Sequence, residues 1–415
     1  MPGSIARLES LSPLKETEFK RYIIFRFIYI MAIRMVATVV GYKLFQLTQS
    51  SFAIGLVGLA EFIPVFSLAL YAGHVIDKSD KRTILLKGAI SYTFCVAGLI
   101  VITSPGIEEN LSKKALEWLF YTIIFFTGLI RAFTGPTTHA IIAQLVPRNV
   151  LHFAANISSS TWLGASIGGH ATAGFFIAWF GVNATFYIIL GYVIISVIIL
   201  SGVKRKPVVY TAIGKGTWES VKEGLKYVFK NKILLGAISL DLFAVLFGGA
   251  VALVPEFAER ILKVGPIGFG WLNAAVDLGS VITMITLTLF PMKRKQGYKL
   301  MYAVAGFGIC IIIFGISDIY IISFLALLIA GLLDGVSVLV RGTILQVTTP
   351  DEMRGRVSSV NSMFINSSNE LGMFESGVTA RFFGAPLAVI FGGSLTLIVV
   401  IITWLKAPSL RKFEY

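Results

Sequence analysis

The chain has 415 residues, of which 56% are hydrophobic and 14% are charged, whereas soluble domains are about 45–50% apolar and about 25% charged. This excess of apolar residues excludes an ordinary soluble protein, and both cysteines lie inside apolar runs, which argues against a disulfide or metal pair. The formal net charge is +14, but the basic residues lie in short loops between apolar runs, which favours membrane topology over nucleic-acid binding.

In chain order, the apolar runs predict twelve membrane-spanning helices, because one span needs about 20 mostly apolar residues. The runs cover approximately residues 22–48, 51–74, 83–104, 116–142, 151–179, 182–203, 233–258, 267–291, 299–316, 319–344, 356–380 and 385–405. We therefore predict an all-α membrane protein with an N-terminal six-helix half over 1–203, a cytoplasmic linker over 204–232 and a C-terminal six-helix half over 233–415.

Lysine and arginine are concentrated in alternate loops, as around residues 78–82, 204–232 and 293–299, while the opposite loops hold acidic residues such as Glu108 and Asp318. Cytoplasmic loops carry the excess of basic residues in membrane proteins. We therefore expect a multi-pass protein of the cell (inner) membrane with both termini in the cytoplasm.

The linker contains apolar residues interleaved with lysines. They are Trp218, Val221, Leu225, Tyr227 and Val228. This pattern predicts an amphipathic helix on the cytoplasmic face of the membrane, and a plain solvated linker is the alternative.

The loop after the second run carries a motif. Residues 73–82 read Gly-His-Val-Ile-Asp-Lys-Ser-Asp-Lys-Arg, which resembles the signature loop of the major facilitator superfamily. The resemblance implies a conformational latch formed by Gly73, Asp77, Lys81 and Arg82. In this latch Asp77, at a helix end, pairs with a basic residue or a helix N-terminus. The alternative is a basic loop that serves topology alone.

Further motifs point to one branch of that superfamily. Arg131-Ala-Phe-Thr-Gly135 resembles an element of the proton-coupled branch, and residues 164–169 are similar to an antiporter motif in which Gly169 replaces the usual proline. Residues 349–357, Thr-Pro-Asp-Glu-Met-Arg-Gly-Arg-Val, resemble a loop of the drug and siderophore exporters, among them enterobactin and macrolide exporters. The resemblance implies two six-helix halves that rock about a mid-membrane site. It also implies a monomer in the lipid bilayer that binds a small-molecule substrate and protons, without cofactor, metal or nucleic acid.

Charged residues inside the predicted spans are candidates for function, because a charge in the bilayer interior costs at least about 2.5–3.5 kcal/mol. The candidates for substrate and proton translocation are Arg34, Arg131, Asp241, Asp334, Arg341 and Glu370. Glu61 and Asp277 rank second, because they lie in spans that usually flank the cavity of this superfamily. Burial favours a neutral carboxyl group, so Asp241 or Asp334 could exchange protons, and Arg131 or Arg341 could bind an anion. The alternative is internal ion pairs that only join helices.

The leading hypothesis is a proton-coupled exporter of small amphiphilic molecules, such as a siderophore or a drug. Two alternatives stay open, a lysophospholipid flippase of the same superfamily and a membrane receptor that kept the fold without transport. An enzyme is not expected, because the sequence has no Ser-His-Asp set and no metal cluster. The chain also has no Walker loop, which argues against an ATP-driven pump.

Overall fold

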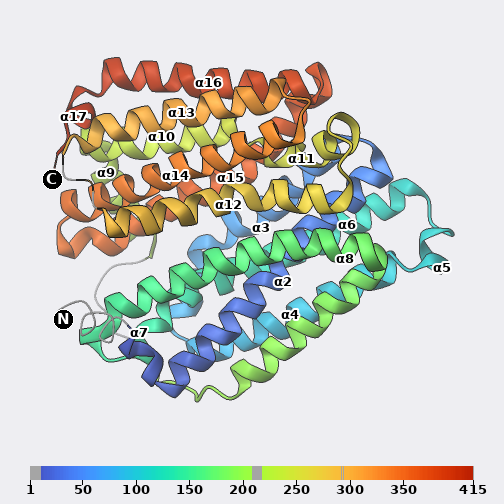
Figure 1. Cartoon of the computed structure of the whole chain (residues 1–415). Helices are drawn as coiled ribbons and strands as arrows, with labels where there is room; N and C mark the ends of the chain where they lie inside the picture. The colour runs from blue at the N-terminus through green and yellow to red at the C-terminus, as the bar shows by residue number, and fades with distance from the viewer. Residues whose placement is uncertain (1–10, 208–216, 291, 293, 415) are drawn as a thin grey trace. The chain divides into compact units, whose positions relative to one another are not determined.

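The computed structural model describes residues 11–207, 217–290, 292 and 294–414 of the chain. Every regular element in these residues is a helix (Figure 1), so the predicted all-α class is confirmed. The chain divides into two compact units. Unit 1 comprises Met1–Val40 and Ile63–Ile213, and unit 2 comprises Gly41–Phe62 and Gly214–Tyr415.

Unit 1 is built on long apolar helices. Its elements are η1 (Ser12–Lys15), the first part of α2 (Thr17–Thr48), the second part of α3 (Ser51–Asp77), α4 (Lys81–Ile102), α5 (Pro105–Glu108), α6 (Lys113–Ala140), α7 (Ile142–Leu145), η2 (Arg148–Val150) and α8 (Leu151–Ser201). Helix α4 packs against both α6 and α8. The 51-residue α8 contains Gly181 with φ +80°, so two helices meet there at a break, as the separate runs 151–179 and 182–203 predict.

Unit 2 holds the rest of α2 and α3 and all later elements. These are α9 (Thr217–Lys230), α10 (Lys232–Gly248), η3 (Ala250–Leu253), α11 (Val254–Glu256), η4 (Phe257–Ile261), α12 (Gly265–Leu289), α13 (Gln296–Ile316), α14 (Tyr320–Thr348), η5 (Asp351–Met353), α15 (Arg354–Phe383), α16 (Ala385–Lys406) and α17 (Pro408–Arg411). Helix α14 packs against α12 and α13, and α10 packs against α15 and α16. Glycines such as Gly331, which faces the backbone of Val276, allow these close approaches.

The number of membrane spans depends on how the helices are counted. Nine helices of the described residues are long and apolar enough to cross a bilayer. Helices α9 and α10 meet at an angle of 101°, and they make a tenth span if the pair is counted as one. The predicted twelve is not reached by this measure for two reasons. Helix α8 counts once although it breaks at Gly181, and α15 carries many serine, asparagine and glutamate residues.

The predicted seventh run, 233–258, is wrong at its C-terminal end. Helix α10 stops at Gly248 and is followed by the short elements η3, α11 and the π-helix η4. The dipeptide Gly248-Gly249 and Pro255 give the physical reason, because both residue types are poor in helix interiors. The apolar character of the segment continues past the helix end, and so hydropathy alone overestimates the span.

Candidate functional site

A buried ion pair joins α10 and α14 of unit 2. The guanidinium of Arg341 on α14 pairs with the carboxylate of Asp241 on α10, and the Asp241 residue is only 5% exposed. Arg341 also donates from Nε to Ser337 Oγ at 3.1 Å. Asp334, Ser337 and Arg341 are three and four residues apart, which places them on one face of α14.

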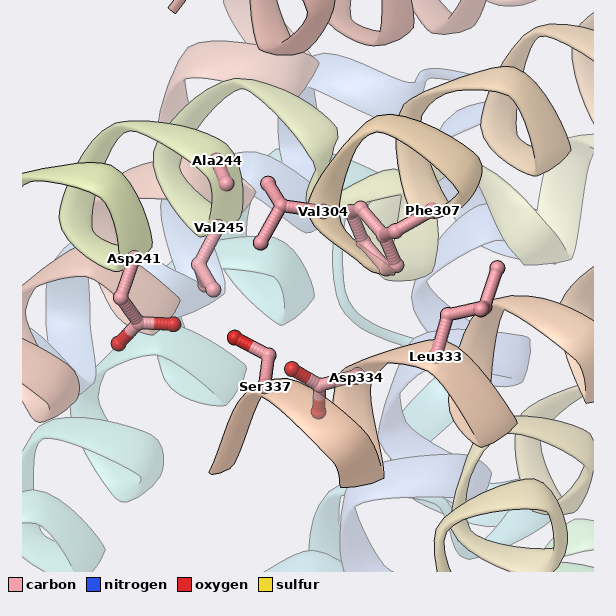
Figure 2. Close-up of a pocket in the computed structure, with 8 residues that line it drawn as sticks. All are labelled: Asp241, Ala244, Val245, Val304, Phe307, Leu333, Asp334 and Ser337. Atoms are coloured by element: carbon pink, nitrogen blue, oxygen red, sulfur yellow. The ribbon is translucent and has the colours of Figure 1, made fainter. Parts of the chain in front are cut away.

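Asp241, Asp334 and Ser337 border a small cavity between α10, α13 and α14. Figure 2 shows Asp334 and Ser337 side by side on α14, across from Asp241 on α10. Five apolar residues complete the lining, namely Ala244, Val245, Val304, Phe307 and Leu333. The cavity measures about 10 Å³, about the space that the centre of one water molecule needs. The site therefore combines carboxylates, a hydroxyl and an apolar wall.

Asp277 on α12 belongs to the same electrostatic group, because it interacts with Asp334, which in turn interacts with Arg341. Both Asp277 and Asp334 are half-buried. Arg341 thus interacts with Asp241 and Asp334, and Asp277 adds a third carboxylate next to Asp334. These four residues would carry a charge of about −2 if all were ionised. Such a cluster favours the uptake of a proton or a cation.

Two other predicted acidic residues of unit 2 lie elsewhere. Glu370 on α15 is 5% exposed, and its backbone faces α3, where a Cβ on Gly58 would lie 2.7 Å from the Glu370 carbonyl oxygen. Glu61 lies half-buried on α3, less than one turn from Gly58. Neither residue lines the cavity of Asp241.

The predicted arginines Arg34 and Arg131 lie in unit 1. Arg34 on α2 stacks its guanidinium over the ring of Trp162 on α8, 4.8 Å from the ring centroid. Four residues further along α2, Thr38 Oγ1 lies 2.7 Å from His170 Nδ1. Arg131 is half-buried on α6.

The motif loop between α3 and α4 is bonded within unit 1. Lys81 donates to the carbonyl oxygens of Ile76 and Ser79. Arg82 donates to the carbonyl oxygens of Ser201, at 2.7 Å, and Val203, at 3.1 Å. Arg82 thereby satisfies backbone acceptors at the end of α8, as basic residues commonly do at helix C-termini.

The two remaining motif residues close α3. Gly73 has open space around its Cα, with nothing within 4 Å of an added Cβ. Asp77 is the last residue of α3, and its side chain lies outside the described part of the structure. The side chain of Trp218 at the start of α9 is also outside that part.

Asp80 caps the N-terminus of α4. Its carboxylate accepts from the backbone N–H of Thr83 at 3.1 Å and from that of Lys206 at 3.2 Å. Partial burial raises the pKa of Asp80, but these hydrogen bonds outweigh it, so the pKa lies below its ordinary value of 3.8. The cap is therefore an ionised carboxylate near neutral pH.

Sequence reasoning missed Arg26, which is only 4% exposed on α2. It lies four residues inside the predicted first span and can be mistaken for an interfacial residue. A signal was available, because Tyr22 precedes it by one helical turn and lies on the same face. Arg26 donates from Nη1 to Tyr22 Oη at 3.4 Å.

Comparison with known proteins now decides the family. The family model described as transmembrane secretion effector matches residues 8–414. The chain belongs to this family of the major facilitator superfamily. It is accordingly a multi-pass membrane transporter of small molecules and not an enzyme.

Relatives of this family member include two curated transporters. The chain is 25% identical over 371 residues to the uncharacterized MFS-type transporter YfiS of Bacillus subtilis, covering 86% of this chain and 85% of YfiS. It is 21% identical over 408 residues to the enterobactin exporter EntS of Shigella flexneri, covering 98% of this chain and 96% of EntS.

Solved structures share the fold at low identity. The nucleoside transporter NupG matches with a TM-score of 0.71 at 13% identity, covering 96% of this chain and 100% of NupG. A D-xylose-proton symporter matches with a TM-score of 0.71 at 12% identity, covering 98% of this chain and 100% of that chain. These matches support the major facilitator fold predicted from the motifs.

Proposed function

We propose that this transporter is a proton-coupled exporter of small amphiphilic molecules, such as a siderophore or a drug. The observation that carries the proposal is the group of Asp241, Asp334 and Ser337 around a cavity between three helices of unit 2, together with the buried ion pair of Asp241 with Arg341. Similarity over almost the whole length to an enterobactin exporter supports export of an amphiphile.

The proton-binding step follows from the charges of the site. Asp241 and Asp334 both interact with Arg341, and Asp277 interacts with Asp334. A proton bound at Asp241 or Asp334 would reduce the repulsion among the carboxylates and loosen the hold of Arg341 on α10. Because Asp241 and Arg341 lie on different helices, protonation would change how α10 and α14 are held together.

Coupling requires that protons and substrate each bind two conformations with different affinity. We propose that the two six-helix halves, 1–203 and 233–415, rock about a mid-membrane site. The loop with Gly73, Asp77, Lys81 and Arg82 would stabilise one conformation. In this proposal the chain acts as a monomer in the inner membrane, with both termini and the 204–232 linker in the cytoplasm.

The test uses the full chain in proteoliposomes with an imposed pH gradient, a panel of siderophores and hydrophobic drugs, and a pH-sensitive dye inside the vesicles. We expect substrate flux to depend on the gradient and to be accompanied by proton flux. Asp241→Asn should abolish the dependence on the gradient. Asp318→Asn is the matched control, because Asp318 is exposed in the turn before α14. Flux in the unmodified chain that ignores the gradient would refute proton coupling.

A further inference from the structure

The charges inside the helices of unit 1 differ in sign from those of unit 2. Its buried and half-buried charges far from helix ends are the arginines Arg26, Arg34 and Arg131. In the described part of unit 1, every carboxylate lies in a loop or within five residues of a helix end. Unit 2 instead holds mainly carboxylates at such positions, including Asp241, Asp277 and Asp334. The charges deep in the helices are therefore positive in unit 1 and mainly negative in unit 2.

Arg26 is held by neutral groups. It donates from Nε to the carbonyl oxygen of Ser158 at 3.3 Å and from Nη1 to Tyr22 Oη at 3.4 Å. The Tyr22 hydroxyl in turn donates to the carbonyl oxygen of Thr138 at 2.5 Å. These bonds use two of the five N–H donors of the guanidinium. A buried cation normally has an anionic partner, and the described partners of Arg26 include none.

Arg34 lies against the same face of α8 as Arg26. Arg26 contacts Ser158 and Arg34 contacts Trp162, and these two α8 residues are four apart, so they share one face. Gly169 continues this face and allows α8 to approach α2, because a Cβ there would lie 2.6 Å from the carbonyl oxygen of Met31. The two arginines are eight residues apart, about 12 Å along α2.

Arg131 lies at an intermediate level on α6. It is seven residues from Thr138, which places both on one face of that helix, and the bond from Tyr22 to Thr138 sets the register between α2 and α6. A helix rises 1.5 Å per residue. Arg26 and Arg34 therefore lie about 6 Å and about 18 Å from this bond along the axis of α2, and Arg131 lies about 10 Å from it along the axis of α6. The three arginines thus follow one another toward the middle of the helices.

We infer that Arg26, Arg34 and Arg131 form a track in unit 1 that binds the anionic group of the transported molecule. Guanidinium groups stay charged and bind carboxylates in a two-pronged geometry. Trp162, next to Arg34, supplies an aromatic surface for the apolar part of the ligand. The ligand class is accordingly an amphiphile with an acidic group and an aromatic ring, and not a lipophilic cation. The inference rests on the proposed function, since it names the charge of the exported molecule.

The test compares two probes that share one fluorophore, the anion dansylglycine and the cation dansylcadaverine. Each is titrated against the full chain in lipid nanodiscs while dansyl fluorescence is followed. We expect tighter binding of dansylglycine, and a loss of about tenfold or more in its affinity in Arg34→Gln and in Arg26→Gln, as is usual when a charged hydrogen-bond partner is removed. Arg34→Lys should keep part of the affinity, because the charge remains.

Two controls separate the track from general effects. Arg21→Gln removes an exposed arginine whose Nη1 donates to the carbonyl oxygen of Gly202 at 2.6 Å, and it should leave dansylglycine binding unchanged. Asp318→Asn, at an exposed residue before α14, should also keep this binding. Failure of proton coupling appears as flux that ignores the pH gradient, whereas failure of the track appears as unchanged dansylglycine affinity in Arg34→Gln, so the two failures give different results. Unchanged dansylglycine affinity in a folded Arg34→Gln chain, or a preference of the unmodified chain for dansylcadaverine, would overturn the inference.

Discussion

The ion pair between Asp241 and Arg341 allows a quantitative test of how unit 2 is held together. The Asp241 side chain is 7% exposed and the Arg341 side chain 10%, so either charge is poorly hydrated when it is left alone. Removing one partner of such a buried pair typically destabilises a protein by about 3–5 kcal/mol. We expect Asp241→Asn and Arg341→Gln each to lower the free energy of unfolding by about this amount.

The two single variants should differ in their pH response. Arg341→Gln removes the positive charge beside Asp241 and Asp334. The repulsion among these two carboxylates and the neighbouring Asp277 then depends on how many of them are ionised. Its stability should therefore fall as pH rises, because low pH neutralises carboxylates. In Asp241→Asn, Arg341 keeps the carboxylate of Asp334 as a neighbour. At neutral pH we therefore expect this variant to lose less stability than Arg341→Gln.

The double variant Asp241→Asn/Arg341→Gln closes the thermodynamic cycle. Because it leaves neither charge of the pair behind, we expect its stability to lie within about 1–2 kcal/mol of the unmodified chain. The assay is thermal unfolding of the purified chain in detergent, followed by tryptophan fluorescence, at several pH values. If the double variant lost as much stability as the two single variants added together, the side chains would contribute independently and the buried pair would be refuted.

Two further predictions concern helix packing and capping. Gly331→Ala on α14 should destabilise the chain by about 1–3 kcal/mol, because the added Cβ would collide with the backbone of Val276. The control is Gly342→Ala on the same helix, where an added Cβ has nothing within 4 Å and should stabilise the chain by up to about 1 kcal/mol. Equal effects of the two substitutions in thermal unfolding would contradict the packing argument. Asp80→Ala should cost about 1 kcal/mol through loss of the cap on Thr83, and Asp80→Asn much less. Because the pKa of Asp80 lies below 3.8, the ionised cap contributes fully to stability above about pH 4, and this contribution is lost as pH falls. If the unmodified chain and Asp80→Ala unfolded in acid with the same profile, this prediction would be contradicted.

Candidate charges could be recognised from the sequence, but their partners could not. Asp241 and Arg341 stand out because each interrupts a run of apolar residues, which is costly in a bilayer. Their pairing joins residues exactly one hundred positions apart on different helices, and no local pattern encodes it. Arg26 shows the opposite case, since its place near a helix start suggests exposure, whereas packing against α6 and α8 buries it.

The sequence by itself determined the helical class, the family and the depth of most charges, because apolar runs of about 20 residues can satisfy their backbone in lipid only as helices. Only the tertiary structure decided that α10 ends at Gly248, that Arg341 lies beside both Asp241 and Asp334 in unit 2, and that arginines follow one another in unit 1. The reason is physical. Helix formation depends on neighbours within a few residues, while the pairing and burial of a charge depend on which helices pack against it.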